Sequence, residues 1–290
     1  MVKSVIGVIG GSGLYDLPSL TIDREERVAS PWGEPSDALR FGHVGDTACV
    51  FLARHGRGHR LSPSTINYRA NIDALKRAGV TDVISMSACG SYKLALPPGT
   101  FVLVDQFVDR TFARQNSFFG TGCVAHVPMA QPVSPHLRLR LAAAAQAEGV
   151  PHHNVGTYVC IEGPQFSTLA ESLDYQARGW DVVGMTAATE AKLAREAELP
   201  YGLCAMVTDF DCWHEEHGAV DVASVIKTMV ENADKANRLL SRALRDIGPE
   251  REACPIGADH SLDGAIMTAP SQRDPALIAK LDAVAGRVLR

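Results

Sequence analysis

Short apolar runs, each ending in glycines or small polar residues, recur along the chain. The first spans residues 5–9 and ends in Gly10-Gly11-Ser12-Gly13, the pattern of a buried parallel strand that enters a glycine turn. These runs are too continuous for strands with one exposed face. We therefore expect seven strands, at residues 5–9, 48–52, 80–86, 101–104, 155–161, 182–185 and 202–207.

Helical patterns lie between several of these strands, and Thr189 is expected to begin and cap one of the helices. The expected helices are at residues 64–77, 135–148, 165–178, 189–198 and 222–244. Because strands and helices alternate, we predict an α/β fold with a mixed, mostly parallel central sheet and helices on both of its faces.

The 290 residues are expected to form a single domain, with a core at about residues 4–245 and a less regular carboxyl-terminal segment at 246–290. Residues 110–131 and 254–270 are rich in turn-forming residues and show no clear period. Loops of this length in a compact domain are usually lids, site walls or subunit contacts, and we expect one of these roles for both.

The composition of the chain limits which binding partners and which cellular compartment we expect for the protein. The net charge is −5 and no run of Lys and Arg exceeds a pair, so nucleic acid is not an expected partner. No stretch reaches the ~18 consecutive apolar residues of a membrane span, and the amino terminus lacks the pattern of a signal peptide. The seven cysteines include no C-x-x-C pair, which indicates free thiols in a reducing cytoplasm.

Three strand ends carry groups that bind anions. The Gly-Gly-Ser-Gly turn can present backbone N–H groups, although it lacks the dinucleotide and Walker patterns and suits a plain turn equally well. The run Arg-His-Gly-Arg-Gly-His that begins at Arg54 concentrates cationic side chains on a flexible backbone, which favours a phosphate over a solvated cluster. Because ligands bind at the carboxyl ends of strands, we expect one anion site formed by Ser12, Arg54, His55, Ser87 and Ala88.

Later strand ends supply groups for a ring and a sugar. Phe166 suits stacking on a flat ring or a place in the core, Met185 suits contact with a sugar or a place in the core, and Thr186 offers a hydroxyl. Asp209 and Asp211 directly follow an apolar strand, where burial keeps a carboxyl protonated and able to act as a general acid. The same Asp-x-Asp pattern also fits the metal-diphosphate ligand of a glycosyltransferase, and the motif alone leaves both readings open.

Two other chemistries are disfavoured. The segment His214-Glu215-Glu216-His217 lacks the i, i+4 histidine spacing of a helical zinc protease site and is interpreted as a polar loop. The Gly-x-Ser-x-Gly motif of serine hydrolases is absent from the sequence.

Six motifs read in order carry a resemblance to a known family. They are Gly-Gly-Ser-Gly, Arg-His-Gly-Arg-Gly-His, Ser-Ala-Cys-Gly-Ser, Ile-Glu-Gly-Pro-Gln-Phe-Ser, Gly-Met-Thr and Thr-Asp-Phe-Asp-Cys-Trp. From about residue 6 to residue 244 the chain resembles the S-methyl-5'-thioadenosine phosphorylases, which belong to the trimeric class of purine nucleoside phosphorylases. It departs at Thr189 and Gln165, where such relatives often have Pro and Arg.

The resemblance implies a purine nucleoside phosphorylase-like fold and a homotrimer with sites near the subunit interfaces. It implies no metal and no organic cofactor, with inorganic phosphate as a co-substrate. The implied reaction is phosphorolysis of S-methyl-5'-thioadenosine to adenine and 5-methylthioribose 1-phosphate.

The resemblance also assigns roles to residues of this sequence. The residues implied to hold phosphate are Ser12, Arg54, His55, Ser87, Ala88 and Thr186. Those implied to contact the nucleoside are Met185 at the ribose, Phe166 and Ser167 at the base, Val222 and Val225 at the methylthio group, and His126 from a neighbouring subunit. The base-reading pair is Asp209 and Asp211, one of which supplies a proton to N7.

That pair indicates which base is preferred. Similar enzymes that act on 6-oxopurines typically carry Asn where Asp209 stands, whereas the amino group of adenine needs acceptors. Three alternatives remain: a phosphorylase for ordinary purine nucleosides or methylthioinosine, a metal-dependent glycosyltransferase, and a nucleoside-binding module without turnover.

Overall fold

The structure is a computed structural model and describes residues 3–11, 14, 17–214 and 222–289. Its strands are β1 Val5–Gly10, β2 Thr21–Glu26, β3 Leu39–Val44, β4 Thr47–Ala53, β5 Asp82–Ser91, β6 Phe101–Val104, β7 Gln106–Asp109, β8 His152–His153, β9 Thr157–Cys160, β10 Val182–Gly184 and β11 Tyr201–Asp209. Its α-helices are α1 Tyr68–Arg77, α2 Pro135–Ala147, α3 Leu169–Ala177, α4 Ala187–Glu196, α5 Val222–Ile247, α6 Pro275–Lys280 and α7 Gly286–Leu289. Within these described residues, no helix is long and apolar enough to cross a membrane.

The strands form one mixed sheet. Its main path runs β2-β3-β4-β1-β5-β10-β9-β7, and β11 joins it at β5 and pairs onward with β6. Among the described strands, β1 is parallel to β4 and β5, and β11 is parallel to β5, whereas β10 is antiparallel to β5. The prediction of a mixed, mostly parallel sheet is confirmed.

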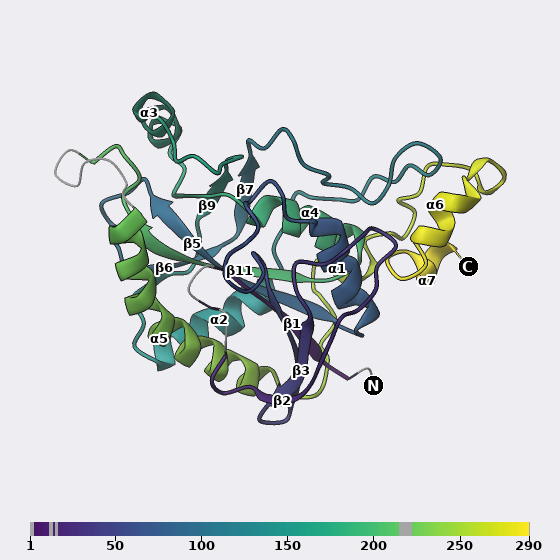
Figure 1. The fold of residues 1–290 in the computed structure, drawn as a ribbon, viewed down its shortest axis with the longest axis horizontal. Helices are drawn as coiled ribbons and strands as arrows, with labels where there is room; N and C mark the ends of the chain where they lie inside the picture. Colours follow the sequence, from purple (N-terminus) through teal and green to yellow (C-terminus); the bar gives the residue numbers. More distant parts are fainter. Residues whose placement is uncertain (1–2, 12–13, 15–16, 215–221, 290) are drawn as a thin grey trace.

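Helices cover both faces of the sheet (Figure 1). Alternate side chains of β5 enter two separate cores, because successive residues of a strand point to opposite faces. Val83 belongs to the core under α1 and α4, whereas Ile84 and Met86 belong to the core under α2 and α5. The predicted three-layer arrangement is therefore correct.

Several strands differ from the sequence expectation. β5 continues to Ser91, so the Ser-Ala-Cys-Gly-Ser motif lies inside the strand rather than after it. The strands β2, β3, β7 and β8 were not predicted. All six residues of β2 are exposed, and its sequence Thr-Ile-Asp-Arg-Glu-Glu has no apolar run to mark it.

Helices α2 and α5 begin at the predicted residues Pro135 and Val222, whereas α1, α3 and α4 begin two to four residues away from their predicted starts. Asn67, Ser134 and Thr168 cap α1, α2 and α3 with their side chains. The prediction that Thr189 caps a helix is wrong, because α4 begins at Ala187 after an N-cap at Thr186, and Thr189 is fully buried within it.

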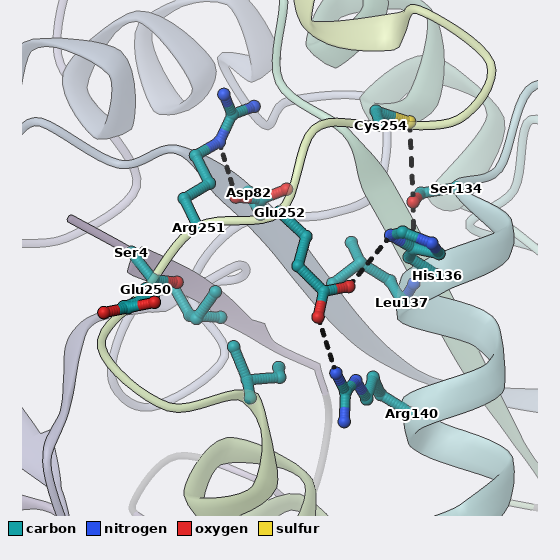
Figure 2. A pocket seen from close by; sticks show the side chains of 12 residues that line it. Ser4, Asp82, Ser134, His136, Leu137, Arg140, Glu250, Arg251, Glu252 and Cys254 are labelled. Atoms are coloured by element: carbon teal, nitrogen blue, oxygen red, sulfur yellow. Dashed lines mark hydrogen bonds and ion pairs between the residues drawn. The ribbon is translucent and has the colours of Figure 1, made fainter. Parts of the chain in front are cut away.

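The segment after α5 returns to the core. Arg251 pairs with Asp82 at 3.2 Å, and Glu252 pairs with Arg140 of α2 at 2.9 Å, around a small pocket of about 40 Å³ (Figure 2). Further along, Leu281 and Val284 join the core that contains α1 and α4.

Candidate functional site

One cavity of about 870 Å³ collects most of the predicted site residues. This volume lies within the usual range for small-molecule sites. The predicted residues in its wall are Arg54, His55, Ser87, Ala88, Phe166, Ser167, Met185, Thr186, Asp209, Asp211, Val222 and Val225. Ser12 and the segment 215–217 lie outside the described residues.

An interruption in strand pairing opens the sheet to this cavity. On one edge of β5, β1 pairs as far as Ser85 and β10 pairs from Gly90 onward. The other edge pairs with β11 as far as Gly90. Between Ser85 and Gly90 one edge of β5 therefore has no strand partner, and Ser87 and Ala88 line the cavity at this gap.

Arg54 directly follows β4 and is 1% exposed. Its Nη1 donates to the carbonyl of Met86 at 3.0 Å, inside the gap in β5 pairing. A Cβ at Gly11 would lie 2.5 Å from Nη1, so the lack of a side chain there lets the backbone at Gly11 pass close to the guanidinium. Burial opposes the charge on Arg54, but the carboxylate of Glu190 outweighs it and raises the pKa of Arg54.

His55 is neutral at physiological pH. Burial, and after it the charge of Arg54, lowers the pKa of His55 to about 3. Its Nδ1 lies 2.8 Å from the carbonyl of Leu61. Because a carbonyl only accepts, Nδ1 carries the proton and Nε2 has none. The ring of His59 stacks on His55 at 4.2 Å.

Asp209 is held at a bulge at the end of β11. Its Oδ2 accepts from Thr208 Oγ1 at 2.7 Å, and its Oδ1 accepts from the backbone N of Asp211 at 2.8 Å. A Cβ at Gly90 would lie 2.8 Å from Oδ1, so this glycine leaves space for the carboxyl. Burial raises the pKa of Asp209, which favours the protonated acid.

Asp211 has a strained backbone with φ of 52°, a region that side chains other than glycine rarely adopt. Its side chain is buried, and burial raises its pKa against the opposing effect of the hydroxyls of Ser172, Ser167 and Tyr92. Strain of this kind is often found where surrounding structure holds a residue for a function.

Another part of the cavity wall is apolar. Val222 and Val225 lie in the first turns of α5, and Ile226, Met229 and Val230 extend the same wall. These last three residues were not predicted. The i, i+4 spacing from Val222 to Ile226 and from Val225 to Met229 was the available signal. His59, Arg60 and Pro63 also line the cavity and were missed.

His126 does not line the cavity of its own chain. It lies on the long loop before α2 and is exposed, and its backbone N donates to the carbonyl of Ala265 at 2.9 Å.

The cavity thus joins three kinds of surface: hydrogen-bond donors at Arg54 and Thr186, the two carboxyls of Asp209 and Asp211, and the apolar side chains of α5. No group of three or more His, Cys, Asp or Glu side chains suited to a metal ion occurs in the described part of the chain.

Comparisons with known proteins agree with this description. The family model described as "Phosphorylase superfamily" matches residues 5–245. The chain is 64% identical to S-methyl-5'-thioadenosine phosphorylase of Bradyrhizobium diazoefficiens, over the full length of both, and 57% identical to that of Cereibacter sphaeroides, over 99% of both.

Solved structures are similar as well. A methylthioadenosine phosphorylase from an antarctic soil metagenomic library shares 41% identity at a TM-score of 0.88, covering 98% of this chain and 99% of that one. The methylthioadenosine phosphorylase of Schistosoma mansoni in complex with adenine shares 39% identity at a TM-score of 0.86, covering 94% and 99%. With a family model matched over most of its length, the chain belongs to the phosphorylase superfamily.

Proposed function

We propose that the protein catalyses the phosphorolysis of S-methyl-5'-thioadenosine to adenine and 5-methylthioribose 1-phosphate. The observation that carries this proposal is that buried anion donors share one cavity with a carboxyl whose pKa is raised by burial. The relatives named for this activity, and the similar structure with bound adenine, support it.

In this reaction an oxygen of phosphate forms a bond to C1' as the bond from C1' to N9 breaks. We propose that Arg54, Ser87, Ala88, Thr186 and Ser12 hold the phosphate, together with His55. Thr186 Oγ1 is buried and makes no hydrogen bond to the described residues, which leaves its donor for a ligand. The bound anion stabilises the positive charge that develops on the sugar.

The electrons of the broken bond enter the purine, and a proton at N7 neutralises them. We propose that Asp209 supplies this proton, since its carboxyl is buried and fixed by Thr208. Asp211 completes a pair of acceptors for the 6-amino group. Phe166 and Ser167 line the base.

The sugar and its 5' substituent occupy the remaining wall. Met185 lies along the ribose, and Val222 and Val225 surround the methylthio group with apolar surface. We assign His126 to the 5' end of a site in a neighbouring copy, in a homotrimer.

Phosphate is the only co-substrate in this proposal, and no metal or organic cofactor takes part. We place the enzyme in the cytoplasm, which suits the seven free thiols. We also propose one domain for residues 1–290, because the carboxyl-terminal Leu281 and Val284 share the core of α1 and α4.

The test is an assay of free base released from methylthioadenosine, adenosine and inosine, each with and without phosphate. We expect adenine from methylthioadenosine only when phosphate is present, and less product from inosine. Release of base without phosphate would exclude phosphorolysis, and equal turnover of inosine would favour an enzyme with broader purine specificity. Inactivation by a chelator would favour the metal-dependent glycosyltransferase.

A further inference from the structure

Glu190 lies behind the cavity, in the first turn of α4. Its side chain is 2% exposed and forms no part of the cavity wall, whereas Arg54 does. Glu190 therefore acts on a ligand only through Arg54.

Both carboxylate oxygens of Glu190 accept hydrogen bonds from other side chains of the protein. Oε1 accepts from Arg54 Nε at 2.5 Å, and Oε2 accepts from Arg54 Nη2 at 3.1 Å. Oε2 also accepts from the hydroxyls of Ser85 and Tyr201, both at 2.9 Å. A planar guanidinium bound at two points by a carboxylate has a fixed orientation.

These contacts leave Arg54 with one free donor. Its Nε is bonded to Glu190, its Nη2 to Glu190 and to Ser85 Oγ, and one hydrogen of Nη1 to the carbonyl of Met86. A guanidinium has five N–H groups, so the remaining donor within the described structure is the second hydrogen of Nη1. This nitrogen lies directly beneath Gly11 of the glycine turn.

The pair also changes the charge of the site. The negative charge of Glu190 cancels the positive charge of Arg54, and the neighbouring His55 is neutral. The Arg54–Glu190 pair and His55 therefore add almost no net positive charge of their own to the site, although Arg54 still presents an oriented donor. Removing one partner of such a buried pair leaves an uncompensated charge, which is costly and which a bound counter-ion relieves.

We propose that Glu190 is a positioning residue for phosphate: it fixes the Nη1 edge of Arg54 toward the anion and limits the affinity of the site. This inference rests on the proposed function. A phosphate bound too tightly or with a rotated guanidinium would be poorly placed for attack on C1'.

The experiment is a double-mutant cycle of Glu190→Gln and Arg54→Met, with Glu196→Gln as control. Glu196 is a second buried glutamate of α4, and it bonds Ser117 and Phe118 instead of Arg54. Binding of inorganic phosphate is measured by calorimetry, and kcat and KM by adenine release from methylthioadenosine.

For Glu190→Gln we expect phosphate to bind at least threefold tighter while kcat falls at least tenfold and KM for the nucleoside changes less than twofold. A merely structural role would lower the active fraction without tightening phosphate. For Arg54→Met we expect at least tenfold weaker phosphate binding, because the unpaired carboxylate repels the anion. The double variant should bind phosphate at least threefold tighter than Arg54→Met does. The control Glu196→Gln should bind phosphate with the affinity of the wild type.

Unchanged phosphate affinity in Glu190→Gln, or a double variant no better than Arg54→Met, would overturn the inference. If Glu190→Gln does not fold, the double variant should fold because it has no unpaired charge, and its failure would also count against the proposal. A wild type that binds phosphate without releasing adenine would refute the proposed function instead, and the binding cycle would still decide the role of Glu190.

Discussion

Asp209 and Asp211 are residues of the same type, but their side chains lie in different surroundings. Both oxygens of Asp209 already accept from Thr208 and from the backbone of Asp211, so its orientation is fixed before a substrate arrives. Asp211 takes a strained backbone conformation and lies near three hydroxyls. Burial raises the pKa of both, which favours the protonated form of each carboxyl.

Replacing Asp209 by Asn should remove that proton while keeping the shape of the side chain. We expect kcat with methylthioadenosine to fall by about 30- to 1000-fold, the effect of losing a preorganised donor worth about 2–4 kcal/mol. Steady-state release of adenine measures this loss. Asp234→Asn on the exposed face of α5 is the matched control and should retain full turnover.

If Asp209→Asn keeps undiminished turnover, Asp209 is not the acid. In that case Asp211→Asn should show the loss, and the assignment would move to that residue.

At the scale of elements, apolar runs predicted seven of the strands, and the groups at the ends of these runs indicated part of the cavity wall, whereas Ser167, Val222 and Val225 were implied only by the family resemblance. Arg54 and His55 follow a buried strand, and the ends of neighbouring strands must meet at one edge of the sheet. Periodicity alone placed Val222 and Val225 on one helix, where they line the cavity.

The remaining features depend on contacts between distant segments. Ser87 and Ala88 lie inside β5 and reach the cavity only because β1 ends and β10 begins along the same edge. Glu190 carries no local signal, since its partner is 136 residues away in the sequence. β2 is fully exposed and shows no hydrophobic period, so tertiary pairing with β3 defines it.

Helix α4 carries a second buried carboxyl with a pH-dependent effect on stability. Burial raises the pKa of Glu196 to about 7 from its ordinary value of 4.5, although Phe118 and Ser117 donate hydrogen bonds to it. The folded protein therefore retains a proton that the unfolded chain releases between these two values. Stability falls as the pH rises through this window.

We expect the free energy of unfolding to decrease between pH 4.5 and pH 7.5 by an amount on the order of 2–3 kcal/mol from this group, at about 1.4 kcal/mol per pKa unit. Glu196→Gln should remove this part of the pH dependence, and the exposed Glu34→Gln should leave it unchanged. Denaturant unfolding at a series of pH values measures both. Parallel curves for wild type and Glu196→Gln would contradict the prediction.

At the scale of the whole molecule, several apolar side chains project from the isolated chain. Helix α3 lies at the periphery (Figure 1), buries only Ser172, and exposes Leu169 and Leu173. Phe112 is 85% exposed on the long loop that also carries His126. A nine-residue helix is marginal in water without packing partners, which supports the proposed contact with other copies of the chain.

If each site combines residues of two copies of the chain, mixing two defective variants in one trimer should restore activity. His126→Ala alone should lower kcat/KM for methylthioadenosine, and Asp209→Asn alone should nearly abolish turnover. In a trimer mixed from both, a subunit with intact Asp209 can receive His126 from an Asp209→Asn neighbour. We therefore expect adenine release from mixed, refolded trimers to exceed the sum of the separate variants, with the assembly checked by solution mass. A stable active monomer, or a mixture no more active than its parts, would show that His126 serves no neighbouring site.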